Sequence, residues 1–457
     1  MFERIKNIHF VGIGGSGMSG IAEVFYNLGY NVSGSDMQKG SITNRLKKLG
    51  IKIFIGHNAR NVRGAHVVVT STAIPRNNGE IKEAQKSGIP VIARIEMLAE
   101  LARLKYTVSV AGTHGKTTTT SMVAFILREG KLDPTIIVGG IINNIGTGAR
   151  LGDGDFLIAE ADESDGSFLK LSPTIVIVTN IDDDHVDYYG SMKNLTSAFA
   201  EHINKIPFYG TAIVNGDDPY IKRIMPGINR KMVTFGMSAS NDYHPRIIAQ
   251  EGYKTTFSVM KKTKNFGSIT LHVPGKHNVL NAMAAAITGL QVGVSFGSIK
   301  RAFREFAGVK RRLEIKGTVN DILVIDDYGH HPTAIKEVLT TIKQAWPRRR
   351  LVVLFQPHRY TRTKALYREF AIVLKNADVI RLLDIYPASE KPIKGVHSSM
   401  IVDWLKKRGV ESHMVKFNDP ALKRSLKPGD IFLSLGAGNV WKVGEWLLKN
   451  RQAVNNV

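Results

Sequence analysis

The sequence predicts an α/β protein of three domains, each built on a mostly parallel β-sheet that helices cover. Three observations support this prediction. Short runs of β-branched residues alternate with segments of helical periodicity, which is typical of parallel sheets. The pattern restarts near residues 104 and 311. In addition, a chain of 457 residues is long enough for about three domains.

The expected strands fall into three sets. The first covers residues 8–13, 31–34, 51–55, 67–70 and 91–93, and the second covers residues 106–111, 156–160, 174–180 and 211–215. Antiparallel strands are expected between residues 246 and 273, and a helix is expected to start near His277. The third set covers residues 322–325, 351–356, 379–383 and 431–435. The predicted domains therefore span residues 1–104, 105–310 and 311–457.

The composition limits the classes of partner. Lysine and arginine outnumber aspartate and glutamate by 62 to 39, and the net charge of +23 indicates an anionic ligand. The basic residues are spread thinly and form no arm with interleaved aromatics, so we expect no nucleic acid as a partner. No apolar run has the length of a membrane helix or a signal-peptide core. The absence of cysteine excludes disulfides and thiolate metal sites, and we expect a cytoplasmic protein that binds no membrane.

A glycine-rich turn follows the first expected strand. Gly12, Gly14 and Gly17 have the G-x-G-x-x-G spacing, which lets the backbone approach a diphosphate at the N-terminus of a helix. Ser35 and Asp36 end the next strand, where an acidic side chain commonly binds a ribose hydroxyl. These features predict a Rossmann-like N-terminal domain that binds a nucleotide diphosphate, of which NAD is the usual example. A tight turn without a ligand is the alternative.

A second glycine-rich loop lies between an apolar strand and a helix. It reads Ala111-Gly112-Thr113-His114-Gly115-Lys116-Thr117-Thr118, with Val110 where the usual motif has its first glycine. In such a loop backbone amides bind phosphates, the lysine reaches the β- and γ-phosphates, and the next hydroxyl binds Mg²⁺. The loop therefore predicts a central parallel sheet of the P-loop ATPase type that binds ATP.

Acidic side chains follow the next two strands of the same expected sheet. Glu160 ends one strand, and the segment Asp182-Asp183-Asp184-His185 follows the other. Because the carboxyl ends of parallel strands meet at one edge of a sheet, Glu160 and His185 are expected near Lys116. A carboxylate at this place is a typical ligand of Mg²⁺. A solvated acidic loop and a structural histidine are the alternatives.

Two further patterns carry less information. Asn278 and Asn281 share one face of an expected helix, where an amide can bind a purine edge, although asparagine also caps helices. The basic run 310–312 is either a solvated linker or a source of cations for a triphosphate. Neither pattern decides between its two interpretations.

Polar clusters follow two strands of the third set. Residues 326–332 read Asp-Asp-Tyr-Gly-His-His-Pro, and residues 356–362 read Gln-Pro-His-Arg-Tyr-Thr-Arg. In a Rossmann-like C-terminal domain both clusters lie at the carboxyl edge of the sheet, where ligands bind. Two arginines and the histidines of the two clusters suit a carboxylate or a phosphate. Surface loops without a ligand are the alternative.

Together these motifs resemble those of the Mur ligase family over essentially the whole chain. The segments that carry the resemblance are residues 11–20, 111–119, 160–165, 326–332 and 356–360. One family feature is absent, since other branches bring a carbamylated lysine to the metal site and residues 197–201 contain no lysine. We therefore expect no modified lysine.

The resemblance implies a role for each matching residue. The catalytic set would be Lys116, Glu160 and His185, with Thr117 and Glu160 as ligands of one Mg²⁺ and His185 as a ligand of a second, and with Mn²⁺ as a substitute ion. ATP would contact Gly112, Thr113, His114, Gly115, Lys116, Thr117, Asn278, Asn281, Arg312 and Asp327. A UDP-sugar would contact Gly14, Gly15, Ser16, Gly17, Met18, Ser35 and Asp36. The amino acid would contact Tyr328, His330, His358, Arg359 and Arg362.

The implied activity is the ATP-dependent formation of an amide in peptidoglycan precursor synthesis. Residues 12–20 favour the branch that joins L-alanine to the lactyl carboxylate of UDP-N-acetylmuramate through an acyl phosphate, with the third domain closing over the second. A branch that recycles a whole murein tripeptide is the nearest alternative. An NAD-dependent oxidoreductase and a P-loop regulator or motor are alternatives of other classes. The oligomeric state does not follow from the sequence.

Overall fold

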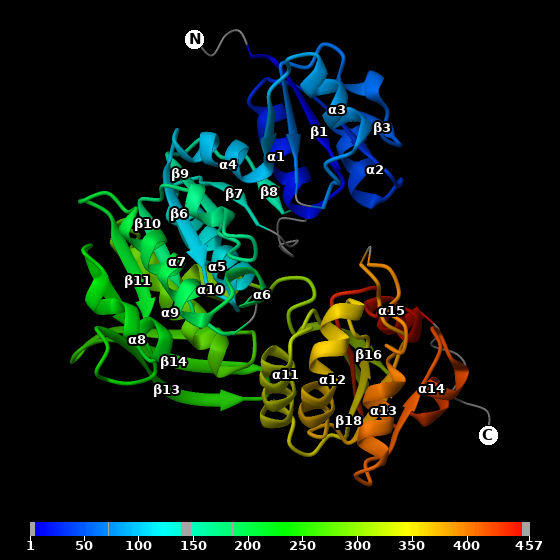
Figure 1. Cartoon of the computed structure of the whole chain (residues 1–457). Coiled ribbons are helices and arrows are strands. Elements are labelled where there is room, and N and C mark those ends of the chain that lie inside the picture. The colour runs from blue at the N-terminus through cyan, green and yellow to red at the C-terminus, as the bar shows by residue number, and fades with distance from the viewer. Residues whose placement is uncertain (1–4, 72, 139–147, 184–185, 389, 450–457) are drawn as a thin grey trace. The chain divides into compact units, whose positions relative to one another are not determined.

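The computed structural model describes residues 5–71, 73–138, 148–183, 186–388 and 390–449, without the side chains of residues 16, 186 and 187. The chain divides into two compact units. The first comprises residues 1–246, 257–269 and 280–306, and the second comprises residues 247–256, 270–279 and 307–457. The strands form three sheets, which confirms the predicted three-domain α/β class (Figure 1). The boundaries near residues 104 and 311 remain a proposal.

The N-terminal sheet belongs to the first unit and has the strand order β3-β2-β1-β4-β5. Its strands are β1 (Asn7–Val11), β2 (Asn31–Asp36), β3 (Lys52–Ile55), β4 (Val67–Thr70) and β5 (Val91–Ala93). Between them lie α1 (Ser16–Asn27), α2 (Ser41–Lys48), the 3-10 helix η2 (Ala59–Val62) and α3 (Gly79–Lys86), and α4 (Arg94–Ala102) follows. Every pair is parallel, and the order is that of a Rossmann-like sheet, as predicted.

The central sheet has the order β15-β14-β13-β12-β11-β10-β6-β9-β7-β8. Its strands are β6 (Tyr106–Ala111), β7 (Thr135–Ile137), β8 (Ala149–Arg150), β9 (Phe156–Glu160), β10 (Ile175–Val178), β11 (Thr211–Asn215), β12 (Met232–Phe235), β13 (Tyr243–Glu251), β14 (Lys254–Lys261) and β15 (Lys264–Leu271). The pairs from β7 through β9, β6, β10 and β11 to β12 are parallel, so the predicted parallel sheet is confirmed.

Strands β13, β14 and β15 are neighbours joined by connections of two residues, which only antiparallel strands can have. The hydroxyls of Thr256 and Thr270 are 2.9 Å apart, and those of Ser258 and Ser268 are 3.3 Å apart, as this register requires. The sequence did not predict β7, β8 or β12, which have two to four residues each.

The helices of the central region are α5 (Lys116–Glu129), α6 (Val186–Tyr189), α7 (Met192–Asn204), α8 (Pro219–Ile224), α9 (Lys276–Gln291) and α10 (Phe296–Glu305), with short 3-10 turns η3 (Ser167–Lys170) and η4 (Met225–Gly227). Side-chain caps start several of them. Ser191 accepts a hydrogen bond from the amide of Asn194 at the start of α7, and Asp218 accepts two at the start of α8. Helix α9 begins one residue from the predicted position at His277.

The C-terminal sheet belongs to the second unit and has the order β16-β17-β21-β18-β19-β20. Its strands are β16 (Glu314–Val319), β17 (Ile322–Asp327), β18 (Leu351–Phe355), β19 (Val379–Leu382), β20 (Ser412–Met414) and β21 (Ile431–Leu435), with helices α11 (Pro332–Ala345), α12 (Tyr360–Leu374), α13 (Ser399–Lys406), α14 (Pro420–Ser425) and α15 (Trp441–Lys449). The sheet is parallel except for β16, an antiparallel edge strand that the sequence did not predict.

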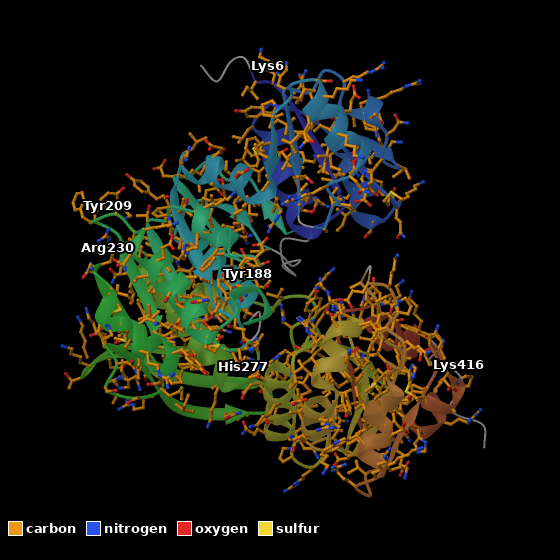
Figure 2. The ribbon with its side chains drawn as sticks, in the orientation of Figure 1. Lys6, Tyr188, Tyr209, Arg230, His277 and Lys416 are labelled. Carbon is orange, nitrogen blue, oxygen red and sulfur yellow. The ribbon has the colours of Figure 1, made fainter. Side chains whose placement is uncertain are left out.

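Side chains that end in nitrogen or oxygen project outward from the ribbon in Figure 2. Phe208 and Tyr209 also lie on the surface, 94% and 60% exposed, and Figure 2 labels Tyr209. Within the described ranges, the structure contains no helix long and apolar enough to cross a membrane.

Candidate active site

The loop between β6 and α5 requires glycine at two positions. Gly112 has a φ of +128°, and a Cβ there would lie 2.2 Å from Thr179 Oγ1. Gly115 has a φ of +83°, and a Cβ there would lie 2.7 Å from Asn281 Oδ1. Backbone strain and lack of space therefore exclude larger residues at both positions. The loop lies against the end of β10 on one side and against α9 on the other.

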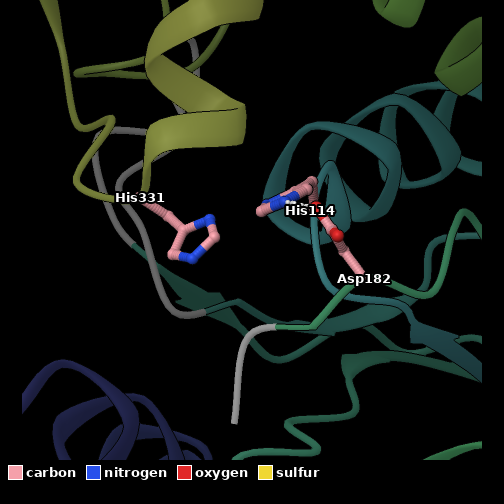
Figure 3. A group of neighbouring side chains, drawn as sticks. All are labelled: His114, Asp182 and His331. Carbon is pink, nitrogen blue, oxygen red and sulfur yellow. Dashed lines mark hydrogen bonds and ion pairs between the residues drawn. The ribbon is translucent and has the colours of Figure 1, made fainter. Parts of the chain in front are cut away.

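Hydrogen bonds attach the same loop to the segment after β10. Asn180 Oδ1 accepts from the amide of His114 at 2.9 Å, and Asn180 Nδ2 donates to the carbonyl of His114 at 3.0 Å. The amide of Asp182 donates to Thr113 Oγ1 at 2.9 Å. His114 Nε2 and Asp182 Oδ2 are 3.2 Å apart (Figure 3). These contacts attach the loop to the segment after β10 on both sides of the His114 peptide.

Strand register places the predicted carboxylate beside this loop. Glu160 at the end of β9 is paired with Val110, and Ala111 is paired with Val178 of β10. Glu160 and the P-loop therefore share one edge of the sheet, as the sequence predicted. Thr117 is the second residue of α5 and is 8% exposed. His185, the other predicted metal ligand, lies outside the described residues.

The donors at this edge fit a magnesium ion. A threonine hydroxyl at a helix start and a carboxylate at the end of a strand in the same sheet are oxygen ligands of the kind that Mg²⁺ prefers. Thr117 and Glu160 would hold the ion.

Lys116 is paired with a carboxylate that the sequence analysis did not select. Its Nζ donates to Glu163 Oε1 and Oε2, both at 2.8 Å, and to the carbonyl of Gly112 at 2.6 Å. Burial alone would lower the pKa of Lys116, but Glu163, Asp162 and Glu160 raise it above its ordinary value. The lysine is therefore charged at neutral pH. Glu163 belongs to the acidic segment 160–165, but nothing in the sequence showed which carboxylate would reach the lysine.

The two predicted adenine-side asparagines are both buried at the start of α9. Asn278 is 6% exposed, and its Nδ2 donates to the carbonyl of Pro274 at 2.6 Å. Asn281 is 5% exposed and contacts the P-loop at Gly115. The structure thus brings Asn281 to the loop and bonds Asn278 to the segment before α9, and adenine binding by either residue stays a prediction.

The N-terminal glycine turn is stabilised by the predicted acid. Asp36 Oδ2 accepts from the amide of Gly14 at 2.9 Å, and a Cβ on Gly14 would lie 2.7 Å from the same oxygen. Met18 is 2% exposed and packs in the core, which gives it a structural role. The side chain of Ser16 lies outside the described part of the chain. Sugar-nucleotide binding by residues 14–18 stays a prediction.

Ser35 belongs to a buried polar cluster around Glu80, which the sequence analysis did not find. The Ser35 hydroxyl donates to Glu80 Oε2 at 2.5 Å, and Asn61 Nδ2 donates to Glu80 Oε1 at 2.5 Å. Burial would raise the pKa of Glu80, but interactions with His9, Ser35 and Asn61 lower it to about 2. The Ser35 hydroxyl thus stabilises a buried carboxylate, and its contact with a sugar nucleotide stays a prediction.

In the second unit, the two aspartates at the end of β17 hold the segment that precedes the sheet. Asp327 accepts from the amides of Leu313 at 2.8 Å and Gly329 at 2.7 Å, while Asp326 pairs with Arg311 Nε at 3.1 Å. Burial raises the pKa of Asp326 to about 6 and also raises that of Asp327. Both carboxylates have structural partners, so an ATP contact of Asp327 stays a prediction.

Four of the five predicted amino-acid residues gather in one cluster of the second unit. The rings of Tyr328 and His330 are 5.4 Å apart, those of His330 and His358 are 5.9 Å apart, and Tyr386 stacks on His358 at 5.7 Å. The guanidinium of Arg312 lies 5.0 Å from the Tyr328 ring. Tyr386 was not predicted, because it follows β19, 28 positions after His358, and no motif surrounds it.

Two arginines of the same segment affect the cluster. Arg359 precedes α12 with a φ of +71°, and its amide donates to the carbonyl of Tyr386 at 2.9 Å. Burial, together with Arg362 and Arg359, lowers the pKa of His358 to about 4. His358 is therefore neutral at pH 7, and the positive charge of the cluster belongs to the arginines, which suits a carboxylate. The structure brings four predicted residues and Arg312 together, and the amino-acid contact itself stays a prediction.

Comparison with known families gives three consecutive matches. Residues 7–106 match the model described as Mur ligase family, catalytic domain. Residues 110–289 match Mur ligase middle domain, and residues 311–438 match Mur ligase, glutamate ligase domain.

Similar proteins cover nearly the whole chain. UDP-N-acetylmuramate--L-alanine ligase of Endomicrobium trichonymphae is 55% identical over 98% of this chain and 99% of that protein. The protein of that name from Geobacter sulfurreducens is 51% identical over 98% of each chain. Among solved structures, the UDP-N-acetylmuramate-alanine ligase of Thermotoga maritima has a TM-score of 0.83 at 32% identity, over 98% of this chain and 99% of the other. A murein peptide ligase of Psychrobacter arcticus shares the fold, with a TM-score of 0.72 at 24% identity, over 99% and 100% of the two chains.

Proposed function

Because the chain belongs to the Mur ligase family, we propose that it is an ATP-dependent ligase that joins L-alanine to UDP-N-acetylmuramate in peptidoglycan precursor synthesis. The observation that carries the proposal is the likeness, over 98% of the chain, to ligases named for this reaction. The P-loop with Lys116, and Glu160 on the neighbouring strand, supports the use of ATP. We propose a cytoplasmic location for the reaction, because it consumes ATP.

The chemistry requires activation of a carboxylate, which is a poor electrophile for an amine. The lactyl carboxylate attacks the γ-phosphorus of ATP, so that an acyl phosphate forms and ADP leaves. The amine of L-alanine then attacks the acyl carbon, and phosphate leaves from the tetrahedral intermediate. No covalent enzyme nucleophile is needed, because phosphoryl transfer depends on positioning and charge neutralisation.

The residues of the P-loop supply that neutralisation. Lys116 and the first amides of α5 offset the repulsion between the carboxylate and the triphosphate. Mg²⁺ held by Thr117 and Glu160, with His185 in the proposed set for a second ion, would neutralise the phosphate oxygens when bound. The cationic cluster of Arg359 and Arg362 beside neutral His358 would orient the carboxylate of L-alanine.

Phosphate release from ATP tests this function. Purified protein is given UDP-N-acetylmuramate with either L-alanine or the murein tripeptide, and release is compared between the two acceptors. We expect turnover with L-alanine and little with the tripeptide. Turnover with the tripeptide and none with L-alanine would identify the protein as the recycling ligase instead. Formation of the product without consumption of ATP would exclude the proposed mechanism.

A further inference from the structure

The ammonium group of Lys116 has all its hydrogen-bonding capacity occupied. Both oxygens of Glu163 accept from it at 2.8 Å, and the carbonyls of Gly112 and Thr113 accept at 2.6 and 3.3 Å. An ammonium has three protons, so four acceptors leave none for a further partner. A phosphate that binds Lys116 must therefore displace at least one of these acceptors.

Glu163 is the acceptor that a phosphate would replace. The two carbonyls belong to the P-loop itself, whose shape the glycines and Asn180 determine. Of the acceptors of Lys116, Glu163 is the one that carries a negative charge. A phosphate oxygen is also an anionic acceptor and can take its place. Its side chain is 0% exposed, and the side chain of Lys116 is 16% exposed. Water therefore weakens this ion pair much less than it weakens a surface pair.

The backbone around Glu163 is also held in place. The Tyr189 hydroxyl donates to the carbonyl of Glu163 at 2.7 Å, and the amide of Gly166 donates to the same carbonyl at 3.1 Å. Asp162 accepts from the amide of Ser164 at 3.1 Å, which closes a turn around Glu163. The carboxylate is thus presented to Lys116 by a segment with its own hydrogen bonds.

We propose that Glu163 is a positioning residue that acts through Lys116. In the nucleotide-free protein it holds the ammonium against the P-loop, and it gives up the ammonium when a triphosphate binds. Glu163 thereby lowers the affinity for ATP, because nucleotide binding breaks a buried ion pair and brings the triphosphate close to a buried carboxylate. This inference rests on the proposed function only in that Lys116 binds the phosphates of ATP.

The test is calorimetric titration of the full-length protein with a non-hydrolysable ATP analogue, with and without Mg²⁺. Glu163→Gln keeps the shape of the side chain and removes its charge. We expect this variant to bind the analogue about tenfold more tightly, the fold-change of one lost charged hydrogen bond. Glu163→Asp retracts the carboxylate by one methylene, and its affinity is expected to lie between those of Glu163→Gln and the wild type.

Asp162→Asn is the matched control, because it removes the same charge one position away from a carboxylate that makes no direct hydrogen bond to Lys116 among those described. A smaller gain in affinity than for Glu163→Gln supports direct competition. Equal gains in both variants would show a general effect of removing acidic charge, and direct competition between Glu163 and the phosphate would be excluded. Unchanged or weaker binding by Glu163→Gln and Glu163→Asp would overturn the proposal.

A further variant separates this inference from the proposed function. Lys116→Met should lose analogue binding if the lysine holds the phosphates. If Lys116→Met binds as the wild type does, the role of the P-loop in the proposed function fails. If Lys116→Met loses binding while Glu163→Gln does not gain it, only the inference about Glu163 fails.

Discussion

At the scale of single residues, the site depends on charges that are buried with specific partners. Lys116 and Glu163 are such a pair, and Glu80 with Ser35 and Asn61 is another. A buried charge is tolerated only while its partner remains, because an uncompensated charge in a low-dielectric interior is costly. The stability and the chemistry of the P-loop are therefore linked through one side chain.

The stability of the Lys116–Glu163 pair can be measured by denaturant unfolding. Lys116→Met leaves Glu163 buried without its cation, so we expect a loss of about 3–5 kcal/mol in the free energy of unfolding. The double variant Lys116→Met/Glu163→Gln should recover most of the lost free energy of unfolding. It should remain without ligase activity. Equal stability of the single and double variants would show that the two side chains do not depend on each other.

Arg359 gives a residue-scale prediction for the C-terminal cluster. Arg359→Ala removes a cation from the proposed alanine site, and the KM for L-alanine should rise by about tenfold or more, while the KM for ATP changes little. The comparison is Arg368→Ala, the same substitution on an exposed turn of α12 away from the cluster. An unchanged alanine KM in Arg359→Ala removes Arg359 from the site.

At the scale of elements, the P-loop strand is tied to the helix that packs on it. Ser109 of β6 and His202 of α7 are 3.0 Å apart at Oγ and Nε2, and both side chains are 0% exposed. Burial, and then Lys205, lower the pKa of His202 from 6.5 to about 3. The neutral imidazole is therefore part of the contact between strand and helix.

This contact predicts a pH dependence of stability. Because the folded pKa of His202 is depressed, its contribution is full above pH 6.5 and is lost as the pH falls from 6.5 toward 3. For this one group the free energy of unfolding should fall by about 1.4 kcal/mol per pH unit within that window. Urea unfolding at several pH values should show a shallower decline in His202→Gln. Parallel pH profiles of the two proteins would contradict the assignment.

The helices and strands also show which features of the fold could be predicted from the sequence. The strand, loop and helix of the P-loop follow one another along the chain, and β6, β9 and β11 have the predicted bounds. The residues that bind the loop could not be predicted from the sequence. Asn180 lies 66 positions from His114, and Glu163 lies 47 positions from Lys116. Strand pairing decides such contacts, and pairing is not visible in local periodicity.

At the scale of the whole molecule, the two glycine-rich turns belong to different sheets. The first follows β1 of the five-stranded sheet, and the second follows β6 of the ten-stranded sheet. A substitution in one turn should therefore leave the hydrogen bonds of the other intact. Lys116→Ala should abolish turnover and change the Kd for UDP-N-acetylmuramate by less than about twofold. Titration of the variant with the sugar nucleotide measures this, and an equal loss of both functions would contradict separate roles.

The sequence by itself determined the α/β class, the two glycine turns and the Mur ligase resemblance, since each depends on neighbours along the chain. Periodicity places strands and helices, and glycine at Gly112 and Gly115 satisfies local backbone needs. Only the tertiary structure decided that Glu163 pairs with Lys116, that Ser35 is bonded to Glu80, and that Tyr386 stacks on His358. Those contacts join residues far apart in the chain, and strand order and burial select them from many chemically equivalent side chains.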